Sequence, residues 1–136
     1  MNDHVFALLV HDRPEPFAAL KRTLGDLGIE TFSVSTCQQA KNLISQCKPH
    51  VIFTEDALAD GSWTRVLKMV EDAEAPINVI VVGVLPDTQQ YISVMERGAF
   101  DFVAPPFEHE PLDFVTRSAA LDVDRRREAS VRSAFA

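Results

Sequence analysis

Short runs of apolar and β-branched residues alternate along the chain with stretches in which apolar residues recur at the spacing of a helix. The short runs are typical of buried strands, and the longer stretches are typical of amphipathic helices. The expected strands are residues 5–10, 30–34, 51–54, 78–82 and 101–104. The expected helices are residues 16–27, 38–46, 62–72, 88–97 and a last one that has Pro111 in its first turn and runs on toward Arg127.

Strict alternation of strands and helices predicts an α/β fold, because right-handed crossovers make the strands parallel and put helices on both faces of the sheet. Gly28 and Gly98 follow two helices as stop signals, and Ser62 is placed to cap another. Ligand chemistry in such sheets collects at the carboxyl ends of the strands. The residues after those ends are His11-Asp12, Glu55-Asp56, Gly83-Val84 and Pro105-Pro106.

The composition is that of one domain without structural disulfides. The chain has 136 residues, 46% of them hydrophobic, and a formal charge of −7, and a chain of this length forms a core unaided. Cys37 and Cys47 form no metal or redox motif, so we expect reduced thiols and a cytoplasmic protein. No apolar run approaches the ~20 residues of a membrane span, and none resembles a signal peptide. The acidic balance argues against nucleic-acid binding by this domain.

Three stretches carry a family resemblance. They are residues 7–15 (ALLVHDRPE), 58–61 (LADG) and 98–107 (GAFDFVAPPF). In sequence and spacing they resemble the receiver domain of bacterial two-component response regulators, especially receivers of sigma-54-dependent activators. The resemblance implies a flavodoxin-like fold, with five parallel strands in the order 2-1-3-4-5 and five helices. Residues 1–120 are then the receiver domain, and residues 121–136 are a C-terminal helix extension or a linker.

A working receiver transfers a phosphoryl group to its own aspartate. In the family, two acids after the first strand hold Mg²⁺, an Asp after the third strand is the nucleophile, and a hydroxyl residue and a Lys after the fourth and fifth strands contact the phosphoryl group. Here these positions fall on His11 and Asp12, Glu55, Gly83 and Pro105. The resemblance therefore implies a degenerate phosphorylation site and a signalling module, rather than an enzyme with a resident cofactor.

Alternatives remain open for each of these residues. Asp12 is either a residual Mg²⁺ ligand or an N-terminal cap of the first helix. Glu55 is either a solvated loop acid or a permanent substitute for the negative charge of a phosphoryl group. His11, Asp12 and Glu55 together are an alternative metal site, and His11 near two carboxylates is an alternative pH sensor. Phosphoryl transfer to Glu55 or to the neighbouring Asp56 is the alternative function.

Phe102 and Pro106 each give a more specific expectation. Phe102 occupies the family's switch position, whose ring turns inward when the hydroxyl residue moves toward the phosphoryl group. Because Gly83 leaves that space empty, we predict that the Phe102 ring is buried inward without any ligand; the alternative is an ordinary half-buried strand aromatic. Pro106 matches the family's cis-proline, so we expect a cis bond between Pro105 and Pro106.

The resemblance also implies a surface for partners on the fourth helix, the fifth strand and the fifth helix. Residues in or near this surface are Tyr91, Met95, Phe102 and Leu112. A partner protein, a fused output domain and a second copy of the chain are the alternative occupants.

Two further features have two interpretations each. Trp63 is either a packing residue at a helix start or an exposed anchor for a partner. The run of arginines at 125–127 is either a solvated helix end or a contact for nucleic acid or an output domain.

Overall fold

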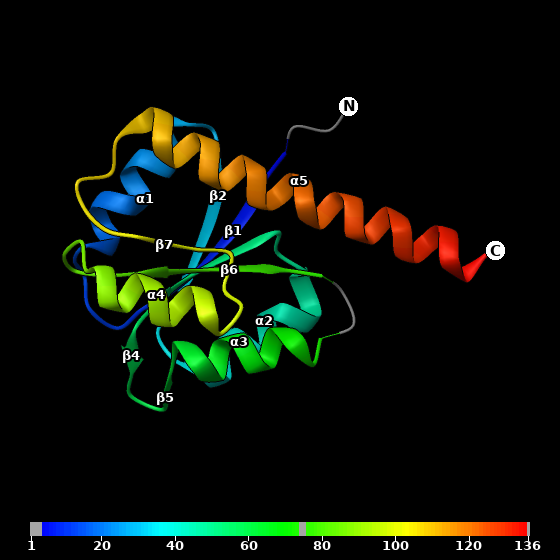
Figure 1. Cartoon of the computed structure of the whole chain (residues 1–136), viewed down its shortest axis with the longest axis horizontal. Helices are drawn as coiled ribbons and strands as arrows, with labels where there is room; N and C mark the ends of the chain where they lie inside the picture. The colour runs from blue at the N-terminus through cyan, green and yellow to red at the C-terminus, as the bar shows by residue number, and fades with distance from the viewer. Residues whose placement is uncertain (1–3, 74–75, 136) are drawn as a thin grey trace.

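The computed structural model describes residues 4–73 and 76–135. Its main sheet has five parallel strands in the order β2-β1-β3-β6-β7, which confirms the predicted α/β class and strand order (Figure 1). The strands are β1 (Phe6–Val10), β2 (Glu30–Val34), β3 (Val51–Glu55), β6 (Asn78–Val82) and β7 (Asp101–Val103). The helices are α1 (Phe17–Asp26), α2 (Cys37–Cys47), α3 (Trp63–Glu71), α4 (Thr88–Glu96) and α5 (His109–Ala134). Strands β4 (Ala57–Leu58) and β5 (Gly61–Ser62) form a short antiparallel hairpin before α3.

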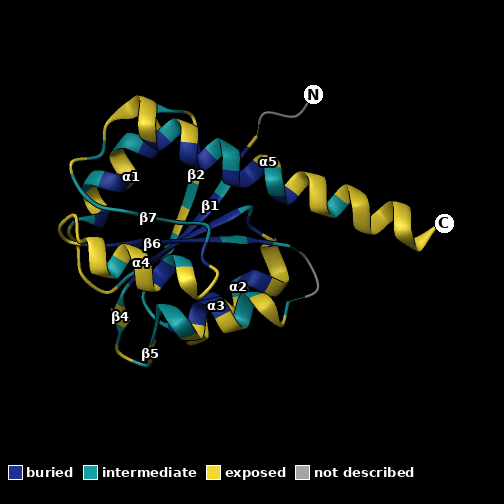
Figure 2. Ribbon diagram, in the orientation of Figure 1, coloured by how far each residue is buried: buried dark blue, intermediate teal, exposed yellow. Residues whose placement is uncertain are grey.

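Helices cover both faces of the sheet. In β1, Leu9 packs with α1 and α5 on one face, while Leu8 packs with α2 and α3 on the other, since neighbouring side chains of a strand point to opposite faces. Helix α4 covers Val81 of β6 on the same side as α3. Strand β3 is buried along its whole length, including Glu55 at its carboxyl end (Figure 2). No described helix has the length and hydropathy needed to cross a membrane.

Local signals explain most element ends. The Ser62 hydroxyl accepts a hydrogen bond from the Thr64 N–H at the start of α3, as expected from the sequence. Gly28 and Gly98 have φ values of 76° and 98°, a region that favours glycine, and they stop α1 and α4. The expectation that Asp12 caps the first helix is wrong, because α1 begins only at Phe17.

Two prolines delay the start of α1. Pro14 and Pro16 disfavour helical backbone in the residue before each of them, which are Arg13 and Glu15. Asp12 is left on an exposed loop, five residues before the helix.

The last helix is 26 residues long and continues through the segment expected to be an extension or a linker. Beyond the sheet it is exposed (Figure 2). Arg126 donates to the Asn78 side chain and pairs with Asp122, and Arg127 donates to three backbone carbonyls. A solvated helix end is therefore the wrong interpretation for Arg127; Arg125 is exposed, and Arg126 is exposed while it bonds to neighbouring side chains.

Trp63 is half-buried at the first turn of α3. It packs against the apolar clusters beneath α2, α3 and α4. Of its two interpretations, the contacts favour packing.

A histidine at the amino end of β3 gives a prediction about pH. The Phe6 N–H donates to Nδ1 of His50, and Nε2 of His50 lies 3.5 Å from Asp124 Oδ1. Burial lowers the pKa of His50 below its usual 6.5, although Asp124 opposes the shift and Arg127 and His4 add to it. The unfolded chain therefore binds this proton first, and the free energy of unfolding should fall as the pH drops below about 6.5 toward the folded-state pKa.

The measurement is urea unfolding of wild type, His50→Asn and His109→Asn at pH 5.0 to 7.5. Asparagine keeps an acceptor for the Phe6 N–H, so His50→Asn should flatten the pH dependence in this window. His109 is exposed and pairs with Asp26, so His109→Asn is the matched control. An equal pH dependence in all three proteins would contradict the prediction.

Candidate functional site

The candidate site lies where the carboxyl ends of four strands meet. His11 and Asp12 follow β1, Glu55 is the last residue of β3, Gly83 follows β6, and Pro105 lies two residues beyond β7. The parallel register brings the ends of these strands to one edge of the sheet. The structure thus places the five positions singled out from the sequence at a common edge.

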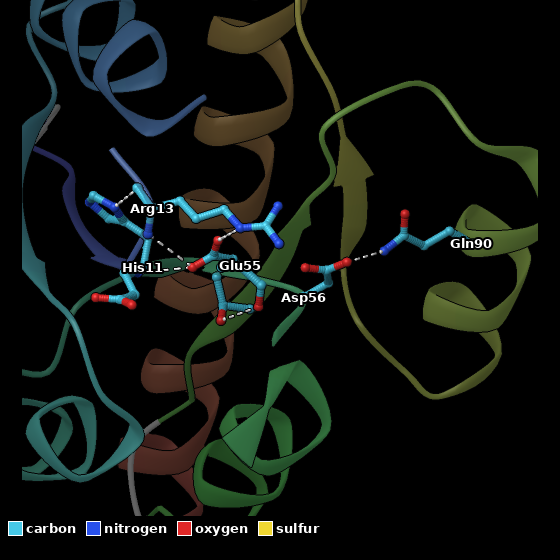
Figure 3. Close-up of polar contacts among 7 residues, drawn as sticks. His11, Arg13, Glu55, Asp56 and Gln90 are labelled. Carbon is cyan, nitrogen blue, oxygen red and sulfur yellow. Dashed lines mark hydrogen bonds and ion pairs between the residues drawn. The ribbon is translucent and has the colours of Figure 1, made fainter. Parts of the chain in front are cut away.

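Glu55 is buried and held by polar contacts (Figure 3). It is 4% exposed, so the interpretation as a solvated loop acid is wrong. Its Oε1 accepts hydrogen bonds from the backbone N–H of Asp12 at 2.9 Å and of Arg13 at 3.4 Å. Its Oε2 lies 3.4 Å from Nε of Arg13. The Glu55 carboxylate at the end of β3 therefore holds the loop that follows β1 in place.

Of these contacts, the hydrogen bonds from the backbone contribute most to holding the loop against Glu55. The Arg13 side chain is 64% exposed, so solvent screens its ion pair with Glu55 and the pair itself contributes little. The N–H bond from Asp12 is short and reaches a buried, charged acceptor, which is the stronger kind of hydrogen bond.

His11 has a structural role in the same loop. Its ring stacks on Phe17 of α1, with ring centroids 4.3 Å apart and planes 5° apart. Its Nδ1 lies 2.7 Å from the backbone oxygen of Arg13, and since a carbonyl only accepts, Nδ1 is the donor. The ring is thus fixed between the loop and the first helix.

The Mg²⁺ that the family resemblance implies does not fit these residues. The ion prefers oxygen ligands, but His11 offers nitrogen, and the Glu55 oxygens already face two N–H groups and a guanidinium. Within residues 4–73 and 76–135, no group of three or more His, Cys, Asp or Glu side chains is arranged to hold a metal ion. The alternative metal site of His11, Asp12 and Glu55 is therefore wrong for this arrangement.

Gly83 and Phe102 are directly against each other. A Cβ at Gly83 would lie 2.4 Å from Cζ and 2.8 Å from Cε2 of the Phe102 ring. The ring also packs with the cluster of Val81, Val94 and Ala99 beneath α4. The ring thus occupies the space that the missing side chain leaves, although it is half-buried rather than fully buried.

The remaining residues at this edge show other contacts. Asp56 is half-buried, and its Oδ2 accepts a hydrogen bond from Gln90 Nε2 of α4 at 3.4 Å. Pro105 supplies no charge at the position that is Lys in the family. The peptide bond between Pro105 and Pro106 is cis, the isomer that the resemblance implies, and the bond between Glu15 and Pro16 is also cis.

The expected partner surface needs one correction. Tyr91 is exposed, and Met95 and Phe102 are half-buried. The correction concerns Leu112, which is 4% exposed and packs in the core beneath α1 and α5; it lines the hollow beside β7 but offers little exposed area of its own. In the first turns of α5, its side chain lies on the side of the helix that faces the sheet.

Two contacts of the site could not be found by sequence reasoning. Arg13 stands on an exposed loop, and no periodicity around it indicates a contact with Glu55. Gln90 reaches Asp56 from another element, 34 residues away in sequence. The one available signal was the position of Arg13, two residues beyond His11 at the carboxyl end of a central strand.

Comparison with known proteins identifies the family. The family model described as the response regulator receiver domain matches residues 7–115. The chain is 31% identical over 122 residues to the C4-dicarboxylate transport transcriptional regulatory protein DctD of Pseudomonas aeruginosa, covering 87% of this chain and 25% of that protein. It is 26% identical over 102 residues to the response regulator protein PilR of the same organism, covering 75% and 23%. The chain thus spans about a quarter of the length of these curated relatives.

Solved structures agree on the fold. NtrX from Brucella abortus in complex with ATP has a TM-score of 0.79 at 23% identity, covering 92% of this chain and 29% of that one. The beryllofluoride-activated NtrC4 receiver domain dimer has a TM-score of 0.74 at 19% identity, covering 87% and 98%. The strand order, the signature around the fifth strand and the family match agree, and the chain belongs to the response regulator receiver domain family.

Proposed function

We propose that this receiver domain regulates a partner through protein contacts without being phosphorylated, either at Glu55, the position of the family's acceptor, or at the neighbouring Asp56. The observation that carries the proposal is the engagement of Glu55. Its carboxylate is buried, and Oε1 already accepts hydrogen bonds from the backbone of Asp12 and Arg13, so an attack on a phosphoryl donor would have to compete with these contacts.

The rest of the edge supports the same proposal. Phosphoryl transfer depends on neutralising and positioning the transferred group. Gly83 has no hydroxyl for this task, and Pro105 has neither a charge nor a backbone donor. The longer stem of Glu55 moves its oxygens by about a bond length relative to aspartate, and a misplacement of about 1 Å costs as much as ~100-fold in rate.

Glu55 is also an incomplete substitute for a phosphorylated aspartate. A carboxylate has one charge, whereas a phosphoryl group has nearly two at neutral pH, and Arg13 offsets part of that charge here. We therefore infer that Glu55 acts by fixing the loop after β1 to β3. The Phe102 ring already lies against Gly83. In this proposal the loop after β1 and the Phe102 ring therefore stay in one conformation and do not switch.

The partner in this proposal contacts the surface formed by α4, β7 and α5. It is an output domain of a longer chain, a separate protein or a second copy. The match covers only 23% and 25% of the relatives named above, and the name of one of them includes a transcriptional regulatory protein, which is consistent with regulation of transcription through such a contact.

The test is exposure of the protein to acetyl phosphate, and separately to beryllofluoride, with Mg²⁺. We expect no gain of one phosphoryl mass in the intact protein, and no amide NMR shifts beyond those caused by Mg²⁺ alone. A receiver with a complete site, treated in parallel, verifies the reagents.

The variant Asp56→Asn locates any adduct. An adduct lost in Asp56→Asn would establish the alternative function at Asp56, and one retained would point to Glu55. Either adduct, or beryllofluoride-dependent shifts centred on Asp12, Glu55 and Phe102, would overturn the proposal.

A further inference from the structure

Two hollows adjoin each other along the edge strand β7. The one on the α4 side, of about 290 Å³, is lined by Tyr91 and Phe102 among others. The one on the α5 side, of about 360 Å³, is lined by Asp101 and Pro111 among others. Both include Ala104, so they form one surface that runs from α4 across the end of β7 to α5.

The charge of this surface has one sign. Asp87 lines the first hollow, and Asp101 and Glu108 line the second. Among the described residues that line either hollow there is no lysine, arginine or histidine. Asp87 accepts from the Gln90 N–H and Asp101 accepts from the Phe102 N–H through one oxygen each, so both carboxylates are held in place while they retain further acceptor capacity.

The same surface has apolar groups that a partner would cover. Tyr91 is 44% exposed, and Leu85, directly before Pro86 of the first hollow, is 70% exposed. Phe114 is 76% exposed and lies one turn after Pro111 on α5, on the same side of the helix. Large apolar side chains gathered on one face and surrounded by polar groups are typical of a protein interface.

A second copy of the chain fits the charge of this surface poorly. In a two-fold dimer through this face, each copy would bring the same carboxylates toward its partner, and like charges brought together cost free energy. Two arginines of the C-terminal cluster, Arg126 and Arg127, are already bound at the opposite end of the sheet. The charge therefore favours a different protein that supplies lysine or arginine.

We propose that the surface of α4, β7 and α5 binds a segment of a separate protein in which aromatic or aliphatic anchors are flanked by lysine or arginine. The apolar anchors fill the two hollows, and the basic residues face Asp101 and Glu108. This inference rests on the proposed function, in which this face contacts the partner, and it adds the chemical class of that partner.

The test is selection of a random 12-residue peptide library, displayed on phage, against the whole immobilised chain without any phosphoryl donor. We expect the enriched peptides to combine Lys or Arg with aromatic or aliphatic residues. One enriched peptide, labelled for fluorescence anisotropy, should bind about tenfold more weakly to Asp101→Asn/Glu108→Gln and to Tyr91→Ala than to wild type. Asparagine at 101 retains the oxygen that accepts from the Phe102 N–H, so the fold is preserved.

The matched control is Glu71→Gln/Glu128→Gln, which removes the same number of exposed carboxylates elsewhere. Enriched peptides without basic residues, or an equal loss of affinity in the control, would overturn the inference. Self-association of the chain that Tyr91→Ala abolishes would also overturn it, in favour of a second copy. None of these outcomes depends on phosphorylation, so they leave the acetyl phosphate result to decide the proposed function separately.

Discussion

Replacement of Gly83 by alanine should displace the Phe102 ring and lower the free energy of unfolding by about 1–3 kcal/mol, as overpacking of a filled space does. The new Cβ would lie 2.4 Å from Cζ of the ring, much closer than non-bonded carbon atoms approach. The backbone at Gly83 is not in the left-handed region, so alanine causes no strain of its own. The loss would thus come mainly from the contact with Phe102, with a smaller share from the Leu85 carbonyl oxygen, which would lie 3.3 Å from the new Cβ.

Gly25→Ala is the matched control for this substitution. Gly25 lies near the end of α1, and a Cβ there would meet nothing within 4 Å. Alanine in a helix should raise the free energy of unfolding by about 0.5–1 kcal/mol. Opposite signs for the two Gly→Ala substitutions, measured by urea unfolding, would therefore separate the contact from the general effect of adding a methyl group.

A double-mutant cycle with Phe102→Ala makes the assignment specific. With the ring removed, Gly83→Ala should cost much less, so the two substitutions should be strongly non-additive. Aromatic NMR of the single variant should show the Phe102 ring in a changed environment. An unchanged Phe102 signal together with additive energies would show that the ring does not fill the space at Gly83.

Much of the fold could be predicted because its signals are local. Apolar β-branched runs such as residues 51–54 and stops such as Gly28 are visible within a few residues of sequence. The hairpin of β4 and β5 was missed because its strands have two residues each, which is too short for any periodicity. Leu112 was named for the partner surface because it lies on the fifth helix, although its spacing from Val115 and Ala119 already indicates the inward face of that helix.

The site was less predictable, since its contacts join distant segments. The pairing of Gly83 with Phe102 could be anticipated, because the resemblance relates these two positions. The contact of Arg13 with Glu55 could not, because it depends on how the loop after β1 turns back over β3. The role of Arg127 was hidden for a similar reason, because backbone carbonyls just before the strands carry no signal in a sequence.

The second large effect that we expect is a loss of stability on replacement of Arg127, in the basic segment of α5. One guanidinium nitrogen of Arg127 donates to the carbonyls of Lys48, Pro49 and Pro76, at 3.2, 3.0 and 3.1 Å. These carbonyls precede β3 and β6, so a single side chain joins the last helix to two neighbouring strands. Burial lowers the pKa of Arg127, but the group remains charged.

Replacement of Arg127 by methionine should lower the free energy of unfolding by about 2 kcal/mol, since it removes hydrogen bonds from a charged donor and leaves half-buried carbonyls without it. Methionine keeps an unbranched apolar stem of similar length, so packing changes little. Arg125→Met is the control, because Arg125 is an exposed neighbour on the same helix. Urea unfolding gives the energies, and amide hydrogen exchange over residues 128–134 should speed up in Arg127→Met alone. Equal effects of the two substitutions would mean that the charge of the helix end, and not the bridge to the carbonyls, holds the extension of α5 against the sheet.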